Sequence, residues 1–403
     1  MSLKFIGAIM ACLLFPSEQA TQAPQVRVDY TLSYGANRYK WKVFIGEDPA
    51  VLDRIRCVEY TLDPVFPDPV RKTCNRADKF AVYVTGADAF KILLKIDWKN
   101  GNLTRQSYML SLHESEGGPS TVTLNNSFIE KYKDRVTIDA TFTVDRVGKI
   151  QPPSLDGDIH IAGRAPEIGL PTVAEIMNAK LESNSAIKKI QAIQGTGRPI
   201  GLSGAWRIWW ERLGEDVEVQ GASDQPLTSS GAAHLFEIHP VSKVDGRSLA
   251  HTFIPIAGYQ TKDADTAFSV YERTYCRIIP HQATTTIVSN KAGYNYVEFV
   301  LRLTESPHTV PDGTMVFADV GNLQGDTIVK HRRMVFVKDT QPETKVRPLR
   351  AGDRLHVVGV PRMDLSQVSS RVKVATASTL KDKYPGILES SLPYEIIVVA
   401  VVE

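Results

Sequence analysis

Short segments that alternate apolar and polar residues between Tyr39 and Leu112 constrain this chain more than any other feature. A period of two places one face of a strand in a core and the other face in water. Segments of this kind are separated by Pro, Gly and Asp and occur at Tyr39–Ile45, Val58–Leu62, Phe80–Val84 and Phe90–Ile96. Their length and spacing predict an immunoglobulin-like β-sandwich over residues 24–113.

The order of motifs in this region resembles the YEATS family, including its bacterial branch, from about residue 26 to residue 113. A strand that carries Trp41 precedes a Phe-Pro-x-Pro-x-Arg loop ending at Arg71, and a Gly-x-x-x-Phe turn follows at Gly86–Phe90. The resemblance implies a YEATS-type sandwich. In the family's reader members, aromatic rings on loops at one end of the sandwich hold an acylated lysine, which requires π faces at fixed positions.

The residues that correspond to the reader pocket depart from the family pattern. The family's readers carry His where Asp63 stands and a hydroxyl residue where Val65 stands, whereas Phe66 agrees. The aromatic residue of the second loop falls on or near Ala87. The resemblance therefore implies the scaffold without the acyl-lysine activity. These four positions are the candidate ligand-binding loops, and Phe66 has a second interpretation as a core anchor.

Cys57 and Cys74 lie almost symmetrically about the segment Pro64–Pro67. An antiparallel pairing around that turn would place the two cysteines opposite each other, and in an oxidising compartment they would form one disulfide. The alternative is two separately buried thiols. No cysteine or histidine spacing in the chain is typical of a zinc site. We expect neither a metal nor a cofactor.

Residues 1–23 have the features of a secretory signal peptide. A short basic start precedes the apolar run Phe5–Phe15, and a polar stretch then ends at Ala23. The run is too short to span a bilayer, which takes about 20 apolar residues. Cleavage after Ala23 leaves Pro24 beside the scissile bond, and Cys12 lies in a faint lipoprotein-like box. We predict export, with a buried N-terminal strand or helix as the alternative.

The rest of the chain predicts more β-structure after a linker at residues 114–130. Arg135–Val144 alternates strictly, and the final run Tyr394–Val402 lacks alternation, which indicates a strand buried on both faces. Residues 172–191 form the only convincing helical segment. No internal repeat is recognisable. Strands, one helix and further strands in this order predict a Greek-key barrel of the OB type.

We assign residues 131–304 to this OB-like domain and residues 305–403 to the same domain or to a second barrel. OB barrels bind oligonucleotides or oligosaccharides on one face. The candidate platform comprises Arg207, Trp209 and Arg212, because a Trp flanked by Arg side chains can stack on a base or a sugar. The alternative is that these side chains pack in the interior.

Catalytic signals are weak, and we predict no catalytic residue. Asp158 and His160 could belong to a metal-assisted hydrolase, although Asp and Gly before a strand are ordinary turn residues. His234 and His239 are five residues apart and would point to opposite faces if they shared one strand.

The composition excludes few functions. The chain has 403 residues, 43% hydrophobic and 23% charged, and its net charge of +2 provides no basic excess for nucleic acid by electrostatics alone. No second long apolar segment predicts a membrane span. The favoured hypothesis is a non-enzymatic exported binding protein whose partner is an unknown protein or envelope component. Nucleic-acid or saccharide binding and a hydrolase remain the alternatives.

Overall fold

The computed structural model describes residues 24, 26–33, 38–62, 66, 68–86, 90–110, 119–211, 217–222, 225–377 and 388–402. The chain divides into two compact units, residues 1–113 and 114–403, which we call unit 1 and unit 2 and describe separately. The predicted signal peptide, residues 1–23, lies outside the described residues. Within the described ranges, no helix is long and apolar enough to cross a membrane.

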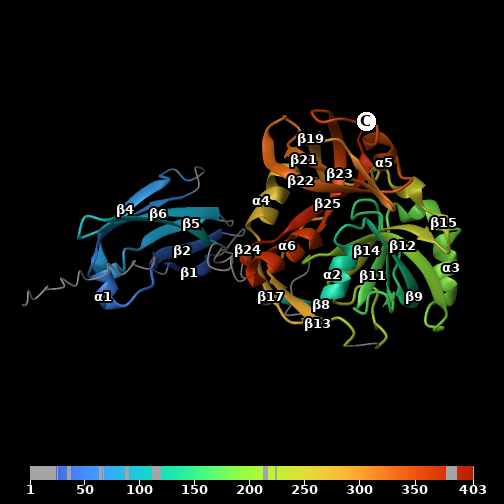
Figure 1. The fold of residues 1–403 in the computed structure, drawn as a ribbon, viewed down its shortest axis with the longest axis horizontal. Coiled ribbons are helices and arrows are strands. Elements are labelled where there is room, and N and C mark those ends of the chain that lie inside the picture. Colours follow the sequence, from blue (N-terminus) through green and yellow to red (C-terminus); the bar gives the residue numbers. More distant parts are fainter. Residues whose placement is uncertain are drawn as a thin grey trace, which may run out of the picture. The chain divides into compact units, whose positions relative to one another are not determined.

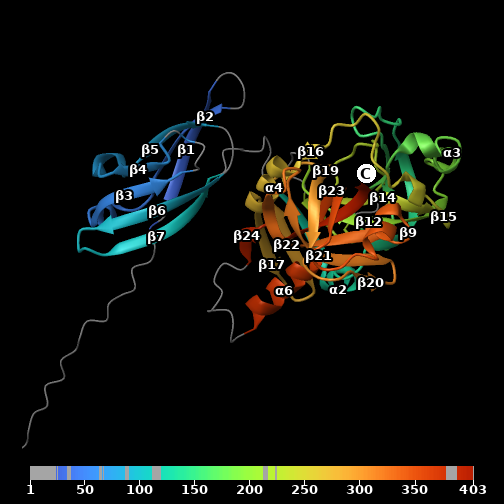
Figure 2. The ribbon, with the colours of Figure 1, turned by 90° about the horizontal axis from the view of Figure 1, so that it is seen from above.

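Unit 1 is a sandwich of two antiparallel sheets, as its alternating segments predict (Figure 2). One sheet has the order β1–β2–β5 and the other has the order β4–β3–β6–β7. The strand bounds are β1 Val26–Ser33, β2 Arg38–Ile45, β3 Ile55–Thr61, β4 Val70–Thr73, β5 Val82–Gly86, β6 Phe90–Trp98 and β7 Leu103–Leu110. Helix α1 (Pro49–Leu52) and the 3₁₀ turn η1 (Arg76–Asp78) connect them. Residues of both sheets, including Trp41, Tyr60 and Leu94, form one buried core.

The strand expected at residues 80–84 begins only at Val82. Lys79 and Phe80 have φ of 51° and 58°, so the chain turns there in a conformation that strands do not adopt. The Phe80 side chain is nevertheless fully buried, and its carbonyl accepts a 2.8 Å hydrogen bond from the Tyr60 hydroxyl. The apolar pattern thus identified a core residue correctly but placed it in the wrong backbone conformation.

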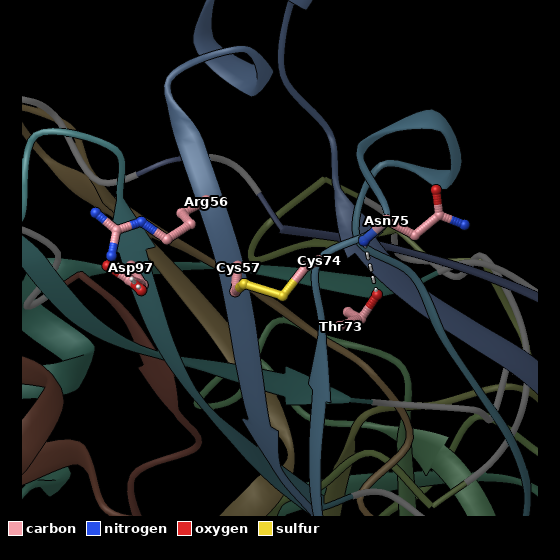
Figure 3. Close-up of a disulfide and its surroundings, with 6 residues drawn as sticks. All are labelled: Arg56, Cys57, Thr73, Cys74, Asn75 and Asp97. Atoms are coloured by element: carbon pink, nitrogen blue, oxygen red, sulfur yellow. Dashed lines mark hydrogen bonds and ion pairs between the residues drawn. A yellow bond between two sulfur atoms is a disulfide. The ribbon is translucent and has the colours of Figure 1, made fainter.

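Cys57 and Cys74 form a disulfide in unit 1 (Figure 3). Strands β3 and β4 pair in antiparallel register with Val58 opposite Thr73. Cys57 precedes Val58 and Cys74 follows Thr73, so the two cysteines lie opposite each other. The pairing places them side by side, as the symmetric positions about the Pro-rich turn predict. The bond closes a loop with a sequence separation of 17 residues.

Unit 2 contains a closed five-stranded barrel, which we call barrel 1 (Figure 1). Its strands are β9 Thr137–Val147, β10 Ile159–Arg164, β11 Thr172–Ile176, β12 Pro199–Ile208 and β14 Phe236–Val244. The antiparallel ladder β11–β10–β9–β12–β14 is closed by a parallel pairing of β11 with β14. This is the strand order of an OB-type Greek-key barrel, and it confirms the predicted fold class.

A second closed barrel, barrel 2, has the same order and lies in the orange to red part of Figure 1. Its strands are β19 Val297–Leu303, β21 Gly313–Gly321, β22 Thr327–Val337, β23 Arg354–Met363 and β25 Tyr394–Val401. Strand β22 pairs in parallel with β25, as β11 does with β14. All eight residues of β25 are buried, so the prediction of a strand buried on both faces is confirmed. Barrel 2 starts at Val297, before the boundary expected at residue 305.

The two barrels repeat an arginine–glutamate pair. Arg207 of β12 lies directly opposite Glu237 of β14, and Arg362 of β23 lies directly opposite Glu395 of β25. Arg207 donates through Nε to the Pro361 carbonyl at 2.7 Å, while Arg362 donates through Nη1 to the Trp206 carbonyl at 3.0 Å. Each arginine therefore donates to the backbone carbonyl of the residue that precedes the other arginine in the sequence.

A glycine precedes each of these arginines by three residues and sits at a register shift of its strand. A Cβ on Gly204 would lie 2.6 Å from Ile238 Cγ2, and one on Gly359 would lie 2.4 Å from Ile396 Cγ2. Such bulges with close backbone approach favour glycine. Matching glycines, arginines, glutamates and isoleucines show that unit 2 contains an internal repeat, which the sequence analysis did not find.

A five-stranded sheet and several helices accompany the barrels. The sheet order is β13–β8–β18–β17–β24, with bounds β13 Val217–Val219, β8 Ser120–Asn125, β18 Thr284–Ser289, β17 Tyr275–Pro280 and β24 Glu389–Ser391. The helices are α2 Asn126–Tyr132, α3 Ala186–Ile193, α4 Ala264–Arg273, α5 Gln341–Val346 and α6 Leu365–Thr376. Helix α4 begins after Asp263 and α6 after Asp364, whose carboxylates accept backbone N–H groups of the first turn. The remaining short elements are β15 Arg247–Ser248, β16 Lys262–Asp263, β20 His308–Val310, η2 Ala179–Glu182 and η3 Ala250–Thr252.

Two expectations for unit 2 are wrong. Residues 120–130, assigned to a linker, form β8 and most of α2. Residues 172–191, assigned to a helix, begin with β11 and become helical only in η2 and α3. Every residue of β11 is buried, so its apolar residues need not alternate, and their spacing matched a helix by coincidence.

Candidate functional site

Of the four candidate loop residues in unit 1, the structure describes Phe66. Its ring is partly buried against the core of the sandwich and meets the Trp41 ring edge-on, with centroids 6.4 Å apart. This contact favours the interpretation of Phe66 as a core anchor. Asp63, Val65 and Ala87 lie outside the described residues.

The candidate Trp/Arg platform in unit 2 is enclosed by protein. Arg207 is fully buried, and Trp209 is 2% exposed. The Trp209 Nε1 donates to the Gly293 carbonyl at 2.7 Å, and its ring packs edge-on against Tyr271 at 5.3 Å. Arg212 lies outside the described residues. The two described side chains therefore match the packing alternative and offer no open face for a base or a sugar.

A different group of polar residues converges on the outer face of barrel 1. Asp158 precedes β10, Glu175 lies in β11, and Glu237 and His239 lie in β14. Their strand neighbours, such as Ile159, Ala174 and Ile238, belong to the hydrophobic core, so alternation turns these four polar side chains away from it. All four are nevertheless at most 5% exposed. We call these four residues the acid–histidine cluster.

The imidazole of His239 lies at the centre of this cluster. Its Nδ1 is 3.2 Å from Glu175 Oε2 and 3.3 Å from Glu237 Oε2. Its Nε2 is 2.8 Å from the Tyr296 hydroxyl and 3.5 Å from Asp158 Oδ2. Three carboxyl groups thus surround one fully buried ring.

Tyr296 covers the cluster from the start of barrel 2. Its hydroxyl donates to Asp158 Oδ2. Tyr296 has φ of 48°, a left-handed conformation that is rare for an aromatic residue and persists only where the surroundings hold the residue in place. The other Asp158 oxygen, Oδ1, is buried without a hydrogen-bond partner, which is costly for a carboxylate.

Arg207 provides the fixed positive charge of the site. Its guanidinium forms an ion pair with Glu237 and lies 3.2 Å from Glu211 Oε1. Burial alone would raise the pKa of Glu237, but Arg207 and the bonds with His234 and His239 together hold it well below its ordinary value. Glu237 is therefore ionised at neutral pH.

The other members of the cluster respond to burial differently. Burial raises the pKa of Glu175 to about 8 and also raises that of Asp158. Burial would lower the pKa of His239, but the surrounding Glu175, Asp158 and Glu237 carboxyl groups raise it well above its ordinary value. Large shifts of this kind are concentrated at functional sites, although structural ion pairs produce them too.

The residues of the hydrolase hypothesis are only partly brought together. Asp158 is in the cluster, and His160 Nε2 lies 3.4 Å from Glu175 Oε1. Asp156 Oδ1 instead accepts the Asp158 backbone N–H at 3.1 Å, which is turn capping. His234 precedes β14 rather than sharing it with His239, so both imidazoles reach Glu237, at 3.2 and 3.3 Å.

Sequence reasoning missed Glu175, Glu237 and Tyr296. Glu175 lay in the segment assigned to a helix, where it had no reason to meet His160. As a strand residue it is paired directly opposite His160 in the β10–β11 register. The Glu-x-His spacing at Glu237 and His239 was the signal that could have been used, because residues two apart on a strand share a face.

Replacing Glu175 with glutamine tests the protonation state of the cluster. A folded-state pKa above the unfolded value favours the folded state at low pH, and this stabilisation is lost as pH rises from about 4.5 towards 8. The wild type should therefore lose about 2 kcal/mol relative to Glu175→Gln between about pH 6 and pH 7.5. Urea unfolding with EDTA present measures this difference.

The matched control is Glu305→Gln, since Glu305 is an exposed carboxylate. Its unfolding free energy should follow the wild type at each pH. Parallel pH profiles for the wild type and Glu175→Gln would show that Glu175 titrates normally.

The comparisons with known proteins concern unit 1. Residues 39–111 match the prokaryotic YEATS domain family. A structure titled as the Yaf9 YEATS domain recognising an H3K122suc peptide is similar over 22% of this chain and 69% of that chain, with 24% identity and a TM-score of 0.19. A structure of the yeast AF-9 homologue Yaf9 is similar over 19% of this chain and 54% of that chain, with 27% identity and a TM-score of 0.17. No curated protein matches the chain.

The match covers nearly the whole sandwich, from β2 to the end of β7, and leaves unit 2 unassigned. It agrees with the resemblance that the Trp41 strand, the Pro-rich loop and the Gly86–Phe90 turn indicate. Residues 39–111 of this chain form a YEATS-like domain.

Proposed function

We propose that this chain is a non-enzymatic exported binding protein whose YEATS-like domain docks on an acidic protein partner. The observation that carries the proposal is the outer face of the four-stranded sheet of unit 1. In the β4–β3–β6–β7 register, Lys72, Glu59, Lys95 and Arg105 form one row across the sheet. We call this face the outer-sheet patch.

The adjacent row of the outer-sheet patch carries two exposed apolar side chains. Thr61 lies opposite both Val70 and Leu93, which are 56% and 49% exposed. Exposed apolar residues rimmed by charges are typical of interaction surfaces. Three cations and one carboxylate in the neighbouring row leave the patch with an excess of two positive charges, which favours an acidic partner.

The acyl-lysine activity of YEATS readers is not part of this proposal. Phe66, the one described residue that agrees with the reader pattern, packs against Trp41. Asp63, Val65 and Ala87 replace the other residues of the pattern. We expect peptides carrying acetyl-, crotonyl- or succinyl-lysine to show no saturable binding to the full chain in fluorescence polarisation at millimolar protein. Saturable binding would show that the domain binds acylated lysine as YEATS readers do, and would contradict this expectation.

Export rests on the signal-like residues 1–23, and the Cys57–Cys74 disulfide supports it because such bonds persist in oxidising compartments. The mass of the mature N-terminus tests it. A chain that begins near Pro24 and is recovered from the envelope or medium is expected. An intact Met1 in the cytosol would overturn the proposed location.

Docking is tested by affinity capture with tagged full-length protein from the envelope fraction. The triple variant Lys72→Glu, Lys95→Glu, Arg105→Glu reverses the charge of the patch and should reduce capture of an acidic protein by about tenfold or more, since like charges repel across an interface. Lys149→Glu, Lys180→Glu, Lys188→Glu makes the same change at three exposed lysines of unit 2 and should leave capture unchanged. Equal capture by all three proteins would exclude the outer-sheet patch.

A further inference from the structure

The internal repeat allows each polar position of barrel 1 to be compared with its counterpart in barrel 2. Ile238 lies opposite Ala174, and Ile396 lies opposite Met334, so Ala174 corresponds to Met334. One residue further, Glu175 corresponds to Val335. The residues after the paired isoleucines correspond as well, which places His239 at the position of Ile397.

The antiparallel registers extend the comparison to the preceding strands. Glu175 lies opposite His160, and Val335 lies opposite Met315, so His160 corresponds to Met315. Two residues earlier, Asp158 corresponds to Gly313. The three counterparts Met315, Val335 and Ile397 are buried members of one apolar cluster, which also includes Met177 and Ala205 from the barrel 1 part of the chain.

Barrel 2 shows that this fold is complete with Gly313, Val335 and Ile397 at the positions of Asp158, Glu175 and His239. The arginine–glutamate pair, by contrast, is kept in both barrels. Burying two additional carboxyl groups and an imidazole in barrel 1 costs free energy that apolar side chains avoid. The polar residues of barrel 1 therefore serve something other than the barrel itself.

The donor set indicates a cation. One ligand atom from each of Asp158, Glu175 and His239 lies within 4.8 Å of the other two. Asp158 Oδ1 is buried with no hydrogen-bond partner, so this carboxylate has an oxygen that a positive charge would stabilise. One imidazole nitrogen with two carboxylate oxygens is a ligand set typical of Zn²⁺ and related first-row ions rather than of Mg²⁺ or Ca²⁺.

A second triplet, Glu175 with His234 and Glu237, also lies within this spacing. Glu237 already forms an ion pair with the fully buried Arg207, whose charge would repel a metal ion there. Among the described residues, Asp158 and Glu175 form their ion pairs with histidines rather than with an arginine or a lysine. The Tyr296 hydroxyl, bound to Asp158 and 2.8 Å from His239 Nε2, is positioned to orient the ligands.

We propose that Asp158, Glu175 and His239 bind one divalent first-row transition-metal ion, with Zn²⁺ or Mn²⁺ as the best matches, on the outer face of barrel 1. The proposal replaces the expectation of no metal site. It is independent of the function proposed for unit 1, because docking through the outer-sheet patch requires no residue of barrel 2 or barrel 1.

The test uses the full chain, stripped with a chelator and then loaded with Zn²⁺, Mn²⁺ or Mg²⁺ alone. We expect about one Zn²⁺ or Mn²⁺ per chain after gel filtration, measured by elemental analysis, and no retained Mg²⁺. The Co²⁺-loaded chain should show d–d absorption bands that EDTA abolishes. A folded wild type that retains neither Zn²⁺ nor Mn²⁺ overturns the proposal.

Variants locate the ion. Asp158→Asn and His239→Gln should each weaken Zn²⁺ binding by more than about 100-fold while circular dichroism shows a folded chain. The control Asp319→Asn changes a buried carboxylate of barrel 2 and should retain the ion. Should a ligand variant fail to fold, His234→Gln decides: unchanged stoichiometry supports the first triplet, whereas loss of the ion assigns it to the second triplet and overturns the proposal.

Discussion

Replacing Arg362 with leucine should destabilise unit 2 by about 3–5 kcal/mol, the range measured when one partner of a buried ion pair is removed. Arg362 is fully buried, and its Nε donates to Glu395 Oε1 at 2.7 Å. The leucine would leave Glu395 with Arg333 as its remaining cation. Urea unfolding followed by tryptophan fluorescence measures the loss, because Trp206, Trp209 and Trp210 are buried in unit 2.

The size of this effect follows from how many groups depend on one side chain. The Arg362 guanidinium also donates to the carbonyls of Arg135, Val136 and Trp206 at 2.9–3.0 Å. It lies 3.8 Å from the centroid of the Trp206 ring. Buried carbonyls that lose their donors each cost about 1–3 kcal/mol.

The control for this prediction is Arg302→Leu. Arg302 also forms an ion pair in barrel 2, with Asp319 at 2.8 Å, but its side chain is 51% exposed. Asp319 is buried but keeps the His331 backbone N–H as a donor, and the exposed Arg302 contributes less than a buried partner, so this variant should lose clearly less stability than Arg362→Leu. Equal losses for the two variants would mean that burial of Arg362 does not set its contribution.

Removing the disulfide should destabilise unit 1 by about 3 kcal/mol, the value expected for a loop of this length. The double variant Cys57→Ala, Cys74→Ala leaves the 17-residue connection open in the unfolded chain, which gains conformational entropy. Hydrogen exchange read by mass spectrometry is the suitable measurement, because it reports unit 1 and unit 2 separately. Faster exchange should appear in β3, β4 and β6 and not in the barrels.

A reductant should reproduce this effect in the wild type and add nothing in the double variant. The remaining described cysteine, Cys276, is buried, and burial raises its pKa to about 12, so it does not react as a thiolate near neutral pH. Cys276→Ala is the matched control and should keep the sensitivity of unit 1 to reductant. Unchanged exchange in reduced wild type would show that the bond contributes little.

The sequence predicted elements whose pattern is local. The strands of unit 1 alternate visibly. The unbroken apolar run at the end of the chain predicted β25, a short strand in which all eight residues are buried. The prediction of a helix in place of β11 was wrong because both faces of this strand are buried. Val173 and Ile176 in the strand and Met177 just after it therefore have a helical spacing without forming a helix. The internal repeat was not recognised in the sequence because only a few matching positions, such as Gly204 and Gly359, carry the same residue in both barrels.

The acid–histidine cluster could not be found from spacing, because its contacts are long-range. Tyr296 and Asp158 are 138 residues apart in the chain, and the packing of barrel 2 against barrel 1 brings them together. Only the neighbours Glu237 and His239 are close in sequence. Long-range polar contacts depend on which strands pair, and the pairing of β11 with β14 is parallel and leaves no hairpin signal.

The reciprocal bonds between the barrels give unit 2 the symmetry of a dimer. Arg207 binds the carbonyl of Pro361 and Arg362 binds that of Trp206, so the same patch on each barrel meets its own copy. This is the isologous contact of a twofold homodimer. Unit 2 thus has the form of two similar subunits joined in one polypeptide. The two halves of one polypeptide need not match each other, and barrel 2 has buried apolar residues where barrel 1 has Glu175 and His239.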